Sequence, residues 1–199
     1  MAKAYQVKDP YFLKAKQDGY RARSAYKLLD IQTRFQILRP NQTVLDLGSA
    51  PGSFLQVLAK IVGKDGYVFG LDLQPIERFK QTNIKTAVCD ILDTVAVDAL
   101  LESWGITKID VMTSDLAPNT SGIRDVDQAR SVELVEMAFE VAKRILRPNG
   151  NFIAKVFQGE DLQLLMPKLK QNFRKVTLFK PPSCRDRSFE TFIVCLGKL

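Results

Sequence analysis

Short apolar runs alternate with helical segments along most of the chain, and this alternation restricts its fold more than any other feature. The runs are four to seven residues long and lie at 43–47, 67–71, 86–89, 109–113, 151–157, 175–179 and 191–196. Helical periodicity is found at 9–35, 54–62, 97–104, 127–146 and 162–172, with Gly19 interrupting the first of these segments. Strands that alternate with helices predict a mostly parallel α/β sheet with helices on both faces.

The last two predicted strands, 175–179 and 191–196, are joined by a segment without helical periodicity. A parallel crossover needs a dozen or more residues, usually helical, so we expect this pair to be antiparallel. A chain of 199 residues suits one domain around one core. The predicted architecture is therefore a single seven-stranded domain at 1–199, with a basic helical extension over about 1–40.

The loop after the first predicted strand, residues 46–54, reads Asp-Leu-Gly-Ser-Ala-Pro-Gly-Ser-Phe. Its two glycines, Gly48 and Gly52, allow a ligand to approach the backbone, and the amides of the next helix can donate hydrogen bonds to it. A dinucleotide site normally reads Gly-x-Gly-x-x-Gly. Here three residues separate the glycines and the third glycine is absent. This spacing disfavours a nicotinamide-dependent dehydrogenase, which remains an alternative.

Acidic residues mark four predicted strands: Asp46 lies in the first, and Asp72, Asp90 and Asp115 follow the next three. Ligands bind at the carboxyl ends of the strands in such sheets. S-adenosylmethionine has no phosphate; it needs backbone contacts for its methionine part and a carboxylate for its ribose. Asp72 is placed for the ribose and Asp90 for the adenine. The alternative is that these residues only cap helices and turns.

The chain has no histidine, which excludes Ser/His and Cys/His nucleophile pairs and His-ligated metal sites. Its three cysteines, Cys89, Cys184 and Cys195, are too few for a four-cysteine zinc site. They are typical of the reduced thiols of a cytosolic protein. No apolar run suits a signal peptide or a membrane span. We therefore expect a cytoplasmic protein without a metal.

The formal net charge of +7 is concentrated towards the two ends of the chain. Residues 1–40 carry nine basic and three acidic side chains, and residues 168–187 carry seven and one. The segment between them, 41–167, has 12 basic and 17 acidic side chains. If the two ends meet on one face, they form a positive surface suited to a phosphate backbone. The alternative is an ordinary solvated surface.

Lys155 lies inside an apolar run expected to be a buried strand. Burying an ammonium group is unfavourable unless it is paired, and Asp115, at the end of a neighbouring strand, is a possible partner. The alternative is a stem that extends past the strand end into solvent. Lys27 and Glu190 cannot be distinguished from surface residues by spacing alone.

Five segments resemble the FtsJ/RlmE family of RNA ribose 2′-O-methyltransferases. They are 19–28 (Gly-Tyr-Arg-Ala-Arg-Ser-Ala-Tyr-Lys-Leu), 46–54, 114–122 (Ser-Asp-Leu-Ala-Pro-Asn-Thr-Ser-Gly), 155–160 (Lys-Val-Phe-Gln-Gly-Glu) and 183–190 (Ser-Cys-Arg-Asp-Arg-Ser-Phe-Glu). The likeness extends in order from about Asp9 to Leu196. It implies a Rossmann-like class I methyltransferase fold, S-adenosylmethionine as cofactor and RNA as partner.

The resemblance also implies roles for individual residues. The family's catalytic Lys-Asp-Lys-Glu set corresponds to Lys27, Asp115, Lys155 and Glu190. Cofactor contacts are implied at Gly52, Phe54, Asp72, Asp90 and Asp115, beside the Gly48 of the loop. One departure is Phe54, where the family commonly has tryptophan; phenylalanine still offers an apolar wall, so we expect at most an altered affinity.

Two motifs resemble the ribosomal RNA branch of that family: Lys-Val-Phe-Gln-Gly at 155–159 and Asp-Leu-Ala-Pro-Asn at 115–119. The resemblance therefore implies methylation of a ribose at a uridine of large-subunit ribosomal RNA. The sequence has no coiled-coil heptads, so we expect a monomer. Two alternatives stay open. One is a methyltransferase acting on transfer RNA; the other is an RNA-binding ribosome-assembly factor that has the fold without turnover.

Overall fold

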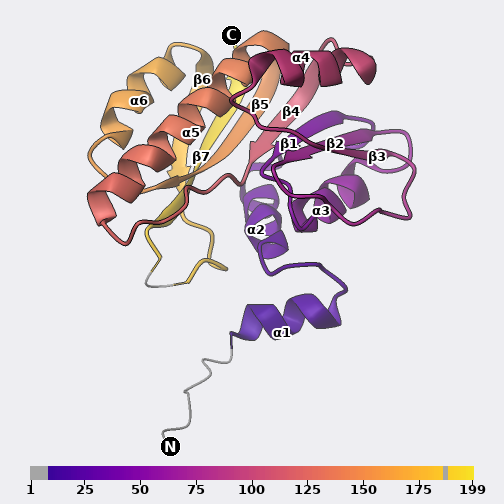
Figure 1. Cartoon of the computed structure of the whole chain (residues 1–199), viewed down its shortest axis with the longest axis horizontal. Coiled ribbons are helices and arrows are strands. Elements are labelled where there is room, and N and C mark those ends of the chain that lie inside the picture. The colour runs from indigo at the N-terminus through magenta and orange to yellow at the C-terminus, as the bar shows by residue number, and fades with distance from the viewer. Residues whose placement is uncertain (1–8, 186–187) are drawn as a thin grey trace, which may run out of the picture.

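The computed structural model describes residues 9–185 and 188–199, and its strands and helices alternate along the chain (Figure 1). The helices are α1 Pro10–Gln17, α2 Ala25–Phe35, α3 Ser53–Val62, α4 Thr94–Ser103, α5 Arg124–Ile145 and α6 Leu162–Lys170. The strands are β1 Thr43–Leu47, β2 Tyr67–Asp72, β3 Ile84–Val88, β4 Ile109–Ser114, β5 Leu146–Phe157, β6 Phe173–Phe179 and β7 Glu190–Lys198.

All seven strands form one sheet in the order β3-β2-β1-β4-β5-β7-β6. The pairs among β1 to β5 are parallel, whereas β7 is antiparallel to both β5 and β6. The predicted antiparallel last strand is therefore confirmed, and so is the Rossmann-like α/β fold. Because β7 is reversed, its first residues lie at the edge of the sheet where the parallel strands end.

Helices cover both faces of the sheet, and alternation along each strand determines which side chain meets which layer. Leu45, Phe152 and Cys195 belong to the core cluster that contains α4, α5 and α6 residues. Val44 and Ile153 belong to the opposite cluster, formed with α2 and α3. Figure 1 shows these two helical layers on either side of the strands.

The predicted helical segment 9–35 consists of two helices separated near Gly19, which has a φ of +75°. Asp9 begins α1 by accepting hydrogen bonds from the backbone amides of Tyr11 (3.2 Å) and Phe12 (3.3 Å). The second helix, α2, has buried Ala25, Leu28 and Ile31 on one face, and packs against α3. This packing holds α2 of the N-terminal extension against α3, the helix that follows β1.

The boundaries of α5 and β5 differ from the prediction. The helix begins three residues earlier, at Arg124, and ends at Ile145. The strand already begins at Leu146, which pairs with Ile109 and is fully buried. The segment Pro148-Asn149-Gly150 is a strong turn signal, so the local sequence predicts that the helix ends just before Pro148. Burial of the Leu146 side chain brings the chain into the sheet before that signal.

The longest helix, α5, has 22 residues but carries acidic and basic side chains throughout. Among the described residues, no helix combines the length and the apolar character that crossing a membrane requires. In the same ranges, no group of three or more His, Cys, Asp or Glu side chains is arranged to hold a metal ion.

Candidate active site

The loop after β1 is held closely between the neighbouring strands. Gly48 and Ser49 donate backbone hydrogen bonds to the carbonyl of Leu71, at 2.9 and 3.2 Å. Gly48 has a φ of +72°, and a Cβ added there would lie 2.9 Å from the backbone nitrogen of Leu116. Only glycine suits both this backbone conformation and this close approach. The loop is therefore fixed at the carboxyl edge of the sheet, beside the residues that follow β4.

Arg21 fastens the N-terminal extension to the same loop. Its guanidinium donates to the carbonyls of Pro51 (3.0 Å) and Arg78 (3.3 Å) and lies 3.8 Å from the centre of the Phe79 ring. Gly52, with a φ of +105°, begins α3 beneath these groups, and a Cβ there would lie 2.6 Å from the Phe79 ring. The sequence alone did not single out Arg21, because its partners are 30 and 57 residues away.

Two of the three acids predicted to contact the cofactor, Asp72 and Asp90, also hold their own turns. Asp72 Oδ2 accepts the Ala50 amide at 2.8 Å, and Oδ1 accepts the Gln74 amide at 2.8 Å. Asp90 Oδ1 accepts the Leu92 amide at 2.9 Å. A carboxylate oxygen can accept more than one hydrogen bond, so these contacts leave capacity for a ligand. Asp72 therefore joins the end of β2 directly to the loop after β1.

Two exposed leucines accompany these acids and were not predicted. Leu73 follows Asp72 and is 68% exposed, and Leu92 lies two residues after Asp90 and is 56% exposed. They follow neighbouring strands, since β2 and β3 are paired up to Asp72 and Val88. Large apolar side chains exposed beside carboxylates are suited to covering a flat heterocycle whose edge is polar.

Asp46 is completely buried in β1. Thr113 donates a 2.6 Å hydrogen bond to its Oδ1, whereas Oδ2 has no hydrogen-bond partner among the described residues. Burial raises the pKa of Asp46 to about 8, although the hydrogen bonds from Thr113 and Ser49 act in the opposite direction. The carboxyl group is therefore largely protonated at neutral pH in the cofactor-free protein.

We expect Asp46→Asn to remove a pH dependence from the stability of the cofactor-free protein. Between about pH 4, the pKa of an unfolded aspartate, and pH 8, folded Asp46 binds a proton that the unfolded chain releases. The stability that this proton adds to the folded protein is fully present below pH 4 and is lost as the pH rises towards 8. Asparagine can still accept the Thr113 hydrogen bond but does not titrate.

Urea unfolding of both proteins across this pH range measures the effect. As the pH rises from 4 to 8, the free energy of unfolding of the wild type should fall relative to that of Asp46→Asn. The expected slope is up to about 1.4 kcal/mol per pH unit. A difference that stays constant from pH 4 to pH 8 would contradict the protonated state of Asp46.

Lys155 is buried in β5, with 8% of its side chain exposed. Its Nζ donates to the backbone carbonyl of Asp115 at 2.7 Å and lies 3.1 Å from Asp115 Oδ1. The expected pairing of these residues is therefore present, and the lysine stem does not extend into solvent. Lys155 is two residues from Ile153 along the strand, so it faces the α2 and α3 layer.

A second ion pair joins Lys27 of α2 to Glu190 at the start of β7, and both side chains are mostly buried. Burial acts to lower the pKa of Lys27, but the nearby carboxylates of Asp115 and Glu190 outweigh it and raise the pKa above the ordinary value. Cys184 donates a 3.7 Å hydrogen bond to Glu190, and burial together with that carboxylate raises the pKa of the thiol to about 11. At neutral pH Lys27 is therefore protonated and Cys184 is a neutral thiol.

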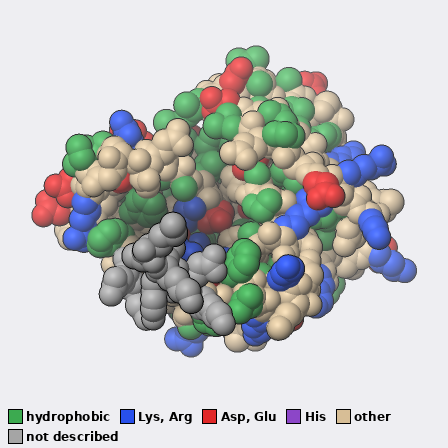
Figure 2. All heavy atoms as spheres, turned by 60° about the horizontal axis from the view of Figure 1, so that its bottom comes forward, with side chains coloured by type: hydrophobic (Ala, Val, Ile, Leu, Met, Phe, Trp, Pro, Cys, Tyr) green, Lys and Arg blue, Asp and Glu red, His purple; other side chains and the backbone are tan. Residues whose placement is uncertain are grey.

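The two ion pairs belong to one site, because Asp115 pairs with Lys155 and its charge also acts on Lys27. Figure 2 shows acidic and basic side chains together in a recess near the middle of this face. Phe54 lies in the core beside it, 2% exposed and stacked on Phe192 with 6.5 Å between ring centres. Its predicted contact with a cofactor remains a prediction.

The N-terminal extension meets the loop between β6 and β7 at this edge. Asp30 accepts the backbone amide of Ser183 at 3.0 Å, and Arg23 donates to the carbonyl of Ser183. Asp9 pairs with both Arg23 and Arg185. Parts of the two predicted basic segments therefore lie side by side. Of the basic residues in these segments, three lie outside the described residues: Lys3, Lys8 and Arg187.

The chain is similar to proteins of one methyltransferase family. The profile of the FtsJ-like methyltransferase family matches residues 20–198. A protein of Anaeromyxobacter sp. (strain Fw109-5), named ribosomal RNA large subunit methyltransferase E, is 44% identical over 198 residues, which are 100% of this chain and 71% of that protein. The protein of the same name from Bdellovibrio bacteriovorus is 42% identical, over 98% of both chains.

Solved structures give the same result. A ribosomal RNA methyltransferase from Plasmodium falciparum superposes with a TM-score of 0.79 at 27% identity, over 90% of this chain and 99% of that one. Fibrillarin from Aeropyrum pernix, solved with bound S-adenosyl-L-methionine, has a TM-score of 0.65 at 17% identity over 87% and 76%, which shows the fold alone. The chain therefore belongs to the FtsJ-like methyltransferase family.

Proposed function

We propose that this protein transfers a methyl group from S-adenosylmethionine to the 2′-hydroxyl of a ribose in large-subunit ribosomal RNA, at a uridine. The observation that carries the proposal is the buried Lys155–Asp115 pair, which shares its site with the Lys27–Glu190 pair beside the glycine loop. The names of the relatives support ribosomal RNA as the substrate.

The residues at the carboxyl edge fit the cofactor. Asp72 offers a carboxylate for the ribose hydroxyls, and Asp90, whose Oδ1 accepts the Leu92 amide, suits the adenine edge. Among the residues that the structure describes, Asp46 Oδ2 has no hydrogen-bond partner, which leaves a buried polar atom beside the loop. The complete proposed set is Gly48, Gly52, Phe54, Asp72, Asp90 and Asp115. When bound, the cofactor supplies a sulfonium methyl group, a good electrophile.

The protein's main tasks are then alignment and control of one proton. Lys155 orients the 2′-hydroxyl and steers its proton, or takes that proton when its side chain is a neutral amine. Asp115 holds the Lys155 ammonium through its carbonyl and its carboxylate. Lys27 keeps its proton, because the pKa of its ammonium is raised, and so acts as a hydrogen-bond donor and not as a base.

RNA recognition would use the basic side chains at this edge. Arg23 and Arg185 lie where the extension meets the β6–β7 loop, the loop that leads into Glu190 and its pair with Lys27. The target nucleotide must leave its stack to present its ribose. A monomeric state, a cytoplasmic location and the absence of a metal requirement stay predictions.

Methyl transfer from radiolabelled S-adenosylmethionine to large ribosomal subunits, naked ribosomal RNA and transfer RNA tests the function. Label in a 2′-O-methyluridine of large-subunit RNA is the expected result, and RNA binding should weaken at least tenfold between roughly 50 and 200 mM salt. Labelling of transfer RNA alone would indicate the other branch of the family. Binding of RNA without any transfer would indicate an assembly factor.

A further inference from the structure

An aromatic side chain is exposed beside the proposed catalytic pairs. Phe189 is 49% exposed, and the guanidinium of Arg124, at the start of α5, lies 4.2 Å from the centre of its ring. Single exposed apolar side chains are common on soluble proteins, so the position of Phe189 matters more than its exposure. A guanidinium over an aromatic ring also forms a flat, cationic π surface. We refer to these two side chains as the Phe189–Arg124 platform.

The platform lies at the same edge of the sheet as the proposed catalytic pairs, on the opposite face. Phe189 precedes Glu190, whose carboxylate pairs with Lys27. The carbonyl of Phe189 accepts a 2.9 Å hydrogen bond from the Gln158 amide, so this residue continues the pairing of β7 with β5. Successive side chains in an extended segment point to opposite faces. Glu190 therefore faces α2, whereas Phe189 meets α5 on the other side of the sheet.

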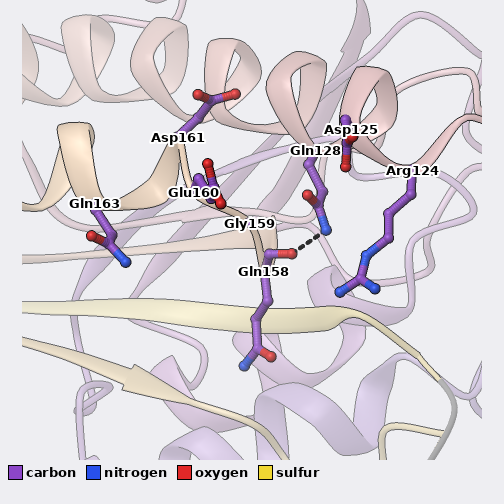
Figure 3. A pocket seen from close by; sticks show the side chains of 8 residues that line it. All are labelled: Arg124, Asp125, Gln128, Gln158, Gly159, Glu160, Asp161 and Gln163. Carbon is purple, nitrogen blue, oxygen red and sulfur yellow. Dashed lines mark hydrogen bonds between the residues drawn. The ribbon is translucent and has the colours of Figure 1, made fainter.

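A hollow of about 610 Å³ opens beside the platform, between the start of α5 and the loop after β5. Figure 3 shows its lining residues: Arg124, Asp125, Gln128, Gln158, Gly159, Glu160, Asp161 and Gln163. The volume lies within the range of ligand pockets, about 300–1,000 Å³. Gln128 is held by its hydrogen bond to the Gln158 carbonyl, while the side chain of Gln158 points away from Gln128.

The side chains that line the hollow favour a nucleobase edge over a phosphate group. Its charged side chains are one cation, Arg124, and three acids, Asp125, Glu160 and Asp161. This excess of negative charge opposes a phosphate group. Amide and carboxylate side chains instead match the amino and carbonyl groups on the edge of a nucleobase. A base that stacks on an aromatic ring or on an arginine needs no phosphate contact at that point.

We propose that the Phe189–Arg124 platform stacks an unpaired nucleobase next to the methylated nucleotide, with the edge of that base entering the hollow. This inference rests on the proposed function, since an RNA ribose can be presented only after the local stack has opened. Stacking on the platform compensates for the base stacking that the RNA loses when the target nucleotide leaves its stack. It acts on substrate binding and contacts neither the reacting hydroxyl nor the cofactor.

Steady-state kinetics on large ribosomal subunits from cells without this methyltransferase test the platform. The proteins compared are the wild type, Phe189→Ala, Phe189→Tyr and Arg124→Ala. We expect Phe189→Ala to raise the KM for subunits by roughly tenfold, because base stacking on one aromatic ring is lost. Arg124→Ala should raise the KM by a smaller factor, and Phe189→Tyr should restore it. The KM for S-adenosylmethionine should not change.

A matched control is Tyr67→Ala, which removes another exposed aromatic ring from the first residue of β2, at the opposite edge of the sheet. Its KM for subunits should equal that of the wild type. An unchanged KM in Phe189→Ala, or an equal rise in Tyr67→Ala, would overturn the platform while leaving the proposed function intact. A wild-type protein that methylates no RNA would overturn the proposed function and this inference with it.

Discussion

Replacing Lys155 by methionine should reduce methyl transfer by about 10²–10⁴-fold, the range typical of a lost acid–base group. Methionine fills a similar volume in the buried strand but can neither donate to Asp115 nor hold the hydroxyl proton. Single-turnover measurements with saturating cofactor and RNA isolate the chemical step. Dissociation constants for S-adenosylmethionine and for RNA, measured by titration, show whether the ligands still bind.

Lys85→Met is the matched control for this variant. Lys85 is also in the sheet, in β3, but its side chain is exposed and lies away from the proposed catalytic set. We expect this variant to turn over like the wild type. If Lys155→Met also kept near-normal turnover while binding both ligands, Lys155 would not be the residue that handles the proton.

Replacing Gly48 by alanine should weaken S-adenosylmethionine binding and reduce turnover by about 10²-fold, the effect of misplacing a site by about 1 Å. The added Cβ would lie 2.9 Å from the Leu116 nitrogen and 3.1 Å from the carbonyl carbon of Asp115. Both are backbone atoms, so the loop or the segment carrying Asp115 must move. Titration with the cofactor and single-turnover kinetics measure the two effects.

Gly105→Ala is the matched control, because it introduces the same backbone strain as Gly48→Ala without the clash. Gly105 has a φ of +71°, almost the same as Gly48, but nothing lies within 4 Å of a Cβ added there. This variant should lose about 1–2 kcal/mol of stability and keep its affinity for the cofactor. Equal affinities in Gly48→Ala and Gly105→Ala would mean that the loop tolerates displacement, and that its backbone does not position the cofactor.

The order of strands and helices could be predicted from periodicity, because buried strands and amphipathic helices leave local patterns. The antiparallel direction of β7 could be predicted because the segment before it is short and lacks helical periodicity. The start of β5 could not be predicted, since Leu146 enters the sheet by pairing with Ile109, and local turn signals at Pro148 point elsewhere. Tertiary burial overrides a local preference at this position.

The candidate site was predictable in part. A lysine inside an apolar run is anomalous, so Lys155 and its partner Asp115 could be inferred from the unfavourable burial of a charge. Lys27 and Glu190 are far apart in the sequence and each is unremarkable in its own segment, so only the family resemblance identified them. Phe189 and Arg124 carry no local signal either, because their contact depends on where α5 begins.

Because β7 runs in the reverse direction, the residues proposed to bind the cofactor and those proposed to contact RNA lie on different connections of the sheet. The proposed cofactor residues lie at or just after the ends of parallel strands. Glu190 instead begins β7, and Phe189 precedes it, where this strand enters the sheet from the same edge. The hairpin between β6 and β7 can therefore change its length and composition without altering the backbone that surrounds the cofactor. Selection for a new RNA target could act on this hairpin while the methyl-donor half of the enzyme stays constant.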